Sequence, residues 1–304
     1  MNNEKTPAQT VPPYPFSKST AMPQPNITIP VDLTNPGQFF ACCGLLELAS
    51  RIDSNAYSWF TQTHFHIAGE ASETLTHFFA ATVTPGEGIL EPADDEDVDK
   101  KSSIRIGPPF NFILDWWREK EDNPDTGAVD AQLKTWSAGQ KVVDIFKCCV
   151  ETTQSKHGKQ KQNISGMRAW MKIAVESEPN DWLGKAVQID KPKSFCFDSR
   201  LSRNNALDQG HTAGGDMAFS PAIDVLCLVG LQRFRPRTIK TWDQNVYWPW
   251  CKPLPVEIAS VATLGHLPQL CLPPMEFSII RRDSAGKYKL IGHAQPYKRS
   301  RNDE

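Results

Sequence analysis

Two stretches of the chain are apolar on nearly every side of a helix, which is typical of helices buried in a core. The first, residues 34–52, opens with the turn sequence NPG and predicts a helix, and Thr34 or Asn35 at its start can cap it. The second predicts a helix over 220–234, with Ser220 as its cap. Gly44 inside the first helix costs about 1 kcal/mol relative to alanine, unless it permits a close approach of another backbone.

Weaker patterns of apolar and polar positions predict the other elements. Strands are expected at 26–33, 64–69, 110–117 and 194–202, and helices at 71–83, 131–153, 164–176 and 253–265. Hairpins are expected at 235–250, with a turn near 243–245, and at 274–292, with a turn at 284–286. Loops are expected at 91–102, 154–163 and 204–219.

The strands come in hairpins rather than in regular alternation with helices, so the predicted fold class is α+β, with mixed hairpin strands packed against buried helices. Residues 1–26 are rich in proline and poor in aliphatic side chains, and they predict a disordered tail. The rest divides by charge into an acidic part, 27–153, and a basic part, 154–304. One continuous domain is the alternative to this division.

The net charge is only −2, but its distribution is uneven. Residues 1–150 hold 11 Lys and Arg against 20 Asp and Glu, a balance of −9, whereas residues 151–304 hold 22 against 15, a balance of +7. A basic half favours contact with nucleic acid. The alternative is that two faces of one domain simply differ in charge.

The sequence indicates a cytoplasmic protein without membrane contact. No apolar run reaches the roughly 20 residues of a membrane-spanning helix, and the N-terminus lacks the pattern of a secretory signal. Four of the eight cysteines form the pairs Cys42-Cys43 and Cys148-Cys149 in apolar, helix-like stretches. Such cysteines behave as small buried hydrophobes, which favours a reduced compartment.

Catalytic and cofactor motifs are missing from the sequence, so neither a cofactor nor an enzymatic activity is expected. There is no phosphate-binding glycine loop, no nucleophile elbow and no HExxH zinc motif. His64 and His66 share one strand face, but no third ligand has useful spacing, so no metal is predicted. His157 and His293 lie in basic surroundings, where a general base for RNA cleavage could sit. The alternative for both is a solvated surface residue.

Basic residues of the C-terminal half gather in three clusters, around 156–172, 191–203 and 233–240, and the last two are interleaved with Phe, Trp and Tyr. Cationic side chains neutralise phosphates, and aromatic rings among them stack on bases. Solvated basic faces and buried aromatics are the plainer interpretation. The candidate nucleic-acid-binding residues are Lys156, Lys159, Lys161, Arg168, Lys193, Arg200, Arg203, Arg235, Arg237 and Lys240.

Several segments together resemble a known family. They are VDLTNPGQFFACCGLLELASRI (31–52), FCFDSRLSRNNALDQG (195–210), FSPAID (219–224), RFRPRT (233–238) and YWPWCKPLPVEIA (247–259). The chain, over roughly 27–304, resembles large-subunit-like proteins of subtype I-U (I-G) CRISPR-associated effector complexes.

The resemblance implies a non-catalytic subunit of an RNA-guided DNA surveillance complex. Its expected partners are the CRISPR guide RNA, target double-stranded DNA, the other effector-complex subunits and the helicase-nuclease that the complex recruits. An RRM-like backbone or cap subunit and a repeat-RNA processing endoribonuclease of the same system are the alternatives. A protein-interaction module without nucleic-acid contact is a further one. No residue that reads a DNA motif is carried over, so the basic candidates rest on charge alone.

Overall fold

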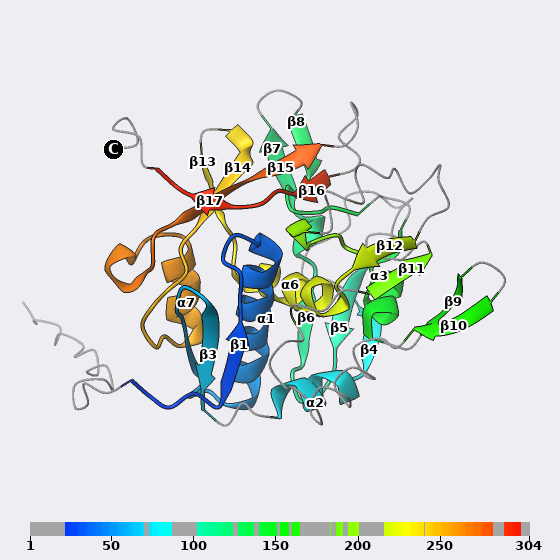
Figure 1. Cartoon of the computed structure of the whole chain (residues 1–304), viewed down its shortest axis with the longest axis horizontal. Coiled ribbons are helices and arrows are strands. Elements are labelled where there is room, and N and C mark those ends of the chain that lie inside the picture. The colour runs from blue at the N-terminus through cyan, green and yellow to red at the C-terminus, as the bar shows by residue number, and fades with distance from the viewer. Residues whose placement is uncertain are drawn as a thin grey trace, which may run out of the picture.

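Two buried helices cross near the middle of the structure, and antiparallel sheets lie around them (Figure 1). The fold is therefore α+β, as the sequence predicts. The structure is a computed structural model. It describes residues 22–69, 73–86, 102–123, 127–136, 140–150, 153–157, 160–164, 183, 187–190, 194–200, 216–239, 241–281 and 289–298.

Helix α1 spans Pro36–Ile52 and helix α6 spans Pro221–Arg233. Both predicted buried helices are confirmed, because every residue of α1 from Pro36 to Ala49 is buried, as is every residue of α6 from Pro221 to Leu231. Asn35 caps α1, its side-chain oxygen accepting the Gly37 N–H at 3.1 Å. Ser220 is the N-cap residue of α6, as predicted, but its side chain makes no capping bond to the helix and its hydroxyl donates to Asp198 instead.

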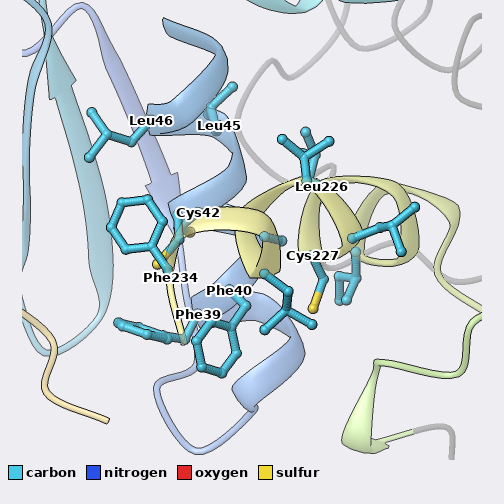
Figure 2. Close-up of a cluster of buried hydrophobic side chains, with 14 of the residues drawn as sticks. Phe39, Phe40, Cys42, Leu45, Leu46, Leu226, Cys227 and Phe234 are labelled. Atoms are coloured by element: carbon cyan, nitrogen blue, oxygen red, sulfur yellow. The ribbon is translucent and has the colours of Figure 1, made fainter. Parts of the chain in front are cut away.

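Glycines let the two helices touch backbone to backbone. A Cβ at Gly44 would lie 1.9 Å from the carbonyl oxygen of Leu226, and one at Gly230 would lie 2.1 Å from that of Phe40. Of the two alternatives for Gly44, the structure shows the close backbone approach, and α6 supplies the approaching backbone. Figure 2 shows the apolar side chains that fill the space around this crossing, among them those of Phe40 and Leu226.

The strands form six antiparallel sheets among the described residues. The three-stranded sheet β1-β3-β2 consists of β1 (Ile27–Pro30), β3 (His64–Ala68) and β2 (Tyr57–Phe60). The largest sheet has the order β13-β14-β15-β16, made of β13 (Arg237–Ile239), β14 (Thr241–Tyr247), β15 (Met275–Arg281) and β16 (Lys289–Ile291), with β17 (Gln295–Pro296) also paired to β15. Tyr247 of β14 stacks on Phe39 of α1 at 4.3 Å between ring centroids, which joins this sheet to the core.

Shorter elements complete the described structure. They are α2 (Thr74–Ala80), β4 (Val83–Gly86), β5 (Ser103–Ile106), β6 (Phe112–Leu114), the 3-10 turn η3 (Trp116–Arg118), β7 (Lys120–Asn123), β8 (Gly127–Asp130), α3 (Val142–Val150), β9 (Thr153–His157), β10 (Gln160–Ile164), β11 (Val187–Asp190), β12 (Asp216–Phe219), α7 (Val256–Thr263) and η4 (Pro268–Leu270). The predicted strand at 64–69, the helix at 253–265 and the strand pairing within 274–292 are confirmed, with small changes of boundary. The turn predicted at 284–286 in this last hairpin lies outside the described residues.

Two predicted elements are shorter than expected, and in the first of them a side chain takes over backbone hydrogen bonds. In the predicted strand 110–117, only Phe112–Leu114 pairs, and the side-chain oxygen of Gln232 accepts the N–H groups of Asp115 and Trp116. Among the described residues of the predicted helix 131–153, only Val142–Val150 is helical. Residues 131–136 are buried without regular structure.

Three loop or turn predictions are wrong. Residues 154–163 fall almost wholly within the antiparallel hairpin β9–β10, whose polar sequence lacks the apolar alternation that marks a strand. Residues 216–219 of the predicted glycine-rich loop pair with β11 as β12. The predicted turn at 243–245 lies inside β14, which pairs with β13, and the register between the two strands shifts between Thr238 and Ile239.

Several predictions fall outside the described residues. These are the tail up to residue 21, most of the charged loop 91–102, and the helix 164–176 apart from Ile164, which ends β10. Both charge-defined parts contribute to one hydrophobic core cluster, for example Phe39 and Ile145 from the acidic part and Phe197 and Leu226 from the basic part. Within the described ranges, no helix is long and apolar enough to cross a membrane.

Candidate nucleic-acid interface

The structure describes the side chains of three of the ten predicted nucleic-acid-binding residues, Arg200, Arg235 and Arg237. Lys156 and Lys161 lie directly opposite each other in the β9–β10 hairpin, so their backbones are placed close together. The remaining five, Lys159, Arg168, Lys193, Arg203 and Lys240, lie outside the described residues.

Arg237, the first residue of β13, and Arg235, two positions before it, each lie over the face of a tryptophan ring. The guanidinium carbon of Arg237 is 4.6 Å from the ring centroid of Trp248, and that of Arg235 is 5.3 Å from the ring of Trp116. Both distances are within the range of an attractive cation–π contact. Arg235 also forms an ion pair with Glu119 at 3.3 Å. Both side chains are half-buried.

The carboxylate of Asp198 holds Arg200 in a bidentate ion pair. Its Nε donates to Oδ1 of Asp198 at 3.0 Å, and its Nη2 donates to Oδ2 at 2.7 Å. Asp198 is buried, whereas 33% of the Arg200 side chain is exposed. Burial alone would raise the pKa of Asp198, but hydrogen bonds from Arg200, Ser220 and Asn35 and the charge of Arg200 outweigh it and lower that pKa. Asp198 is therefore an anion at neutral pH.

Asp224 fixes the segment that carries Asp198. Its Oδ2 accepts the hydroxyl of Ser194 at 2.5 Å and the N–H of Phe195 at 2.9 Å, and its Oδ1 accepts the N–H of Phe197 at 3.2 Å. These bonds explain why the strand predicted at 194–202 is wrong, since a carboxylate takes the place of a neighbouring strand. Cys196 between them has a φ of 59°. Burial raises the pKa of Asp224 to about 6, despite the hydrogen bonds that oppose this shift.

The two candidate histidines for RNA cleavage have different surroundings. His293 is exposed, and its Nδ1 lies 3.3 Å from the hydroxyl of buried Ser199. His157 ends strand β9, opposite Gln160.

His64 and His66 lie on one face of β3, as predicted. Nδ1 of His66 is 3.0 Å from the Thr28 hydroxyl, and its ring stacks on Trp59 at 5.2 Å between centroids. Burial and the neighbouring His64 lower the pKa of His66 from its usual value. No cluster of three or more His, Cys, Asp or Glu side chains able to hold a metal ion occurs in the described part of the chain.

Known proteins do not add to this picture. Comparison with protein-family models, with curated proteins and with solved structures gives no match. The resemblance drawn from the sequence therefore stays a prediction.

Sequence reasoning missed both buried aspartates. Asp224 had one usable signal, because it is an acidic residue inside an otherwise apolar helix, and such a residue needs partners when it is buried. Asp198 had none, since its alternation with Phe195 and Phe197 suggested an ordinary strand. Apart from Arg200, the hydrogen-bond partners of both aspartates among the described residues lie 22 or more positions away along the chain.

Proposed function

We propose that this protein is a non-catalytic, nucleic-acid-contacting subunit of a type I CRISPR RNA-guided DNA surveillance complex. The observation that carries the proposal is the pair of arginines at β13, each oriented over a tryptophan ring. The sequence resemblance supplies the identity of the complex. Cytoplasmic location, guide RNA, target double-stranded DNA, the other subunits and the helicase-nuclease all belong to this proposal.

Oriented guanidinium groups suit the backbone of a nucleic acid. Arginine presents several N–H donors in a plane, which matches phosphate oxygens and stacks on aromatic rings. The cation–π contact at Trp248 restrains Arg237 before a ligand arrives, so less side-chain entropy is lost on binding. In an RNA-guided complex the target sequence is read by base pairing, and apart from a short adjacent motif the protein's contacts are made to the backbone without regard to sequence.

Co-purification with a guide RNA and the sister subunits tests the proposal. The chain is co-expressed with candidate backbone subunits and a CRISPR array, and the purified assembly is analysed for RNA. We expect a complex containing guide RNA, with nucleic-acid affinity that falls steeply as salt is raised. A chain that purifies alone, with affinity independent of salt, contradicts the proposal.

The matched variants are Arg237→Ala and Arg105→Ala. Arg105 is exposed on β5 in the acidic part of the chain, so its replacement removes one positive charge outside the proposed interface. We expect Arg237→Ala to lower affinity and to reduce the salt dependence by about one phosphate contact, whereas Arg105→Ala leaves both unchanged. Equal effects of the two variants would indicate a response to net charge only.

A second candidate function is cleavage of repeat RNA with His293 as general base. The observation that favours it is the exposed imidazole whose Nδ1 faces the Ser199 hydroxyl, which fixes the ring. Incubation of the purified protein with repeat RNA separates the two functions. Intact RNA supports the binding subunit, and cleavage that is lost in His293→Ala supports the endoribonuclease.

A further inference from the structure

Arg237 has a simpler environment than the other two described candidate arginines. Its guanidinium carbon lies 4.6 Å from the ring centroid of Trp248, and within the described part of the chain it makes no hydrogen bond or ion pair. Arg200 and Arg235 differ, because each of them is paired with a carboxylate. The main interaction that orients Arg237 is therefore its contact with the indole ring.

The indole beside Arg237 is itself fixed in place. Trp248 is 6% exposed, and its backbone N–H donates to the carbonyl oxygen of Thr263 at 3.1 Å. Gly265 packs so closely against the ring that an added Cβ would lie 2.7 Å from its Cε2 atom. Gly265 has a φ of 81°, in the left-handed region that favours glycine. The ring is thus a firm support for the guanidinium.

The strand register places Arg237 on the outward face of the largest sheet. Arg237 lies opposite Val246 of β14, and Val246 lies opposite Glu276 of β15, so the three side chains share one face. Tyr247 and Phe277, the next residues on β14 and β15, point to the other face and pack in the core. The guanidinium therefore belongs to the face that is turned away from this core.

The outward face is exposed farther along β14 and β15. Gln244 and Ser278 lie opposite each other, Gln244 half-buried and Ser278 exposed, and Ile280 beyond them is 50% exposed. This surface combines neutral hydrogen-bonding groups with one apolar side chain. It suits unpaired nucleobases, which have flat apolar faces and hydrogen-bonding edges.

A carboxylate on the same face favours a neutral ligand group over Arg237. Glu276 lies two strand spacings from Arg237, about 10 Å. Its Oε1 accepts the Nε2–H of exposed Gln295 at 2.8 Å. The negative charge of Glu276 repels a phosphate placed between the two side chains, whereas a base carries no charge. A base therefore fits best over the face of the guanidinium, and the N–H edge remains for a phosphate.

We propose that Arg237 is a stacking platform for an unpaired nucleobase, with its guanidinium held between that base and the Trp248 ring. The inference rests on the proposed function above and specifies the ligand as single-stranded nucleic acid. Guanidinium planes stack on bases as well as on aromatic side chains. A duplex keeps the faces of its bases within its own stack, so only an unpaired base can lie on Arg237.

The experiment compares strands that carry the same phosphates. Affinity of the full-length protein is measured for a labelled single-stranded RNA and for its abasic counterpart, and both measurements are repeated with DNA. Wild type is expected to bind the intact strand about tenfold more tightly than the abasic strand. A preference in only one of the two nucleic acids supports the inference and identifies the source of the strand. Equal affinity for intact and abasic strands of both kinds overturns it.

Arg237→Lys shows whether this preference comes from Arg237. Lysine keeps the positive charge but lacks the planar group, so we expect most of the preference for intact strands to be lost while the salt slope stays that of wild type. Arg105→Lys, exposed on β5, is the matched control and should keep the preference. Thermal unfolding checks that both variants are folded. Wild-type preference in Arg237→Lys overturns the inference.

Failure of the inference is distinguishable from failure of the proposed function. Wild-type protein without salt-dependent binding to nucleic acid contradicts both. Salt-dependent binding that is the same for intact and abasic strands contradicts only the stacking role of Arg237.

Discussion

The crossing of α1 and α6 and the junction around Asp198 and Asp224 lie next to each other, but different interactions stabilise them. The crossing is apolar and depends on two glycines that let backbones touch. The junction is polar and buried, and two carboxylates there replace the hydrogen bonds of a sheet or a cap. The crossing should thus respond to side-chain volume and not to pH, whereas the junction should respond to the charge of its two aspartates.

The largest expected effect is at the crossing. Gly230→Ala places a Cβ 2.1 Å from the carbonyl oxygen of Phe40, which is backbone and cannot swing aside. We expect a loss of about 3 kcal/mol or more in the free energy of unfolding, although alanine is the better helix former. Urea unfolding measures it. Gly86→Ala is the control, because the nearest atom to its added Cβ is the Arg105 Cβ at 3.0 Å, which a small shift can accommodate, and a similar loss there would contradict the comparison.

The pH dependence of stability is the next largest effect, and it comes from the junction. The folded-state pKa of Asp224 is raised from 3.8 to about 6, so the stability it contributes when protonated is lost as pH rises from about 4 to about 6. The shift corresponds to about 3 kcal/mol. The lowered pKa of Asp198 acts the other way, and its stabilisation is lost as pH falls below the ordinary aspartate value.

Asp224→Asn removes the contribution of Asp224 to the pH dependence of stability and leaves that of Asp198. Chemical unfolding of wild type and variant is measured between pH 4 and pH 7, and the difference in stability is plotted against pH. We expect the stability of wild type relative to the variant to fall across this window, because only wild type must ionise a buried carboxyl. A difference that stays constant with pH would show that burial does not shift the pKa of Asp224.

A smaller effect is expected when one donor is removed from the junction. Ser194→Ala deletes the hydroxyl that donates to Asp224 and that accepts the Cys196 N–H at 2.9 Å. We expect a loss of about 2 kcal/mol, typical of a hydrogen bond to a charged group, and a further rise in the pKa of Asp224. Thermal unfolding at pH 7 and at pH 5 measures both, since the loss should shrink at the lower pH.

The smallest effect on stability is expected at the surface arginines. Arg237→Ala removes a partly exposed cation–π contact with Trp248, which is worth below about 1 kcal/mol. The same variant is expected to weaken nucleic-acid binding, so its two effects should be unequal. A large loss of stability in thermal unfolding would instead assign Arg237 to the core.

Prediction from sequence succeeded where the signal is local. Helices α1 and α6 and the α+β class follow from apolar periodicity and cap chemistry over short windows. It failed where distant side chains satisfy the backbone, as with Gln232 at residues 115–116 and Asp224 at residues 194–197. It also failed at β9–β10, whose polar strands carry no apolar alternation.

The candidate site also has features that the sequence shows and features that only the structure shows. The sequence by itself determined that arginines and aromatic residues are interleaved at 233–250, because composition needs no coordinates. Only the tertiary structure decided that Arg237 lies over Trp248, that Arg235 lies over Trp116, and that Asp198 ties Arg200 to the starts of α1 and α6. Apart from the local Asp198–Arg200 pair, these contacts depend on how distant segments pack, and residue spacing does not encode that packing.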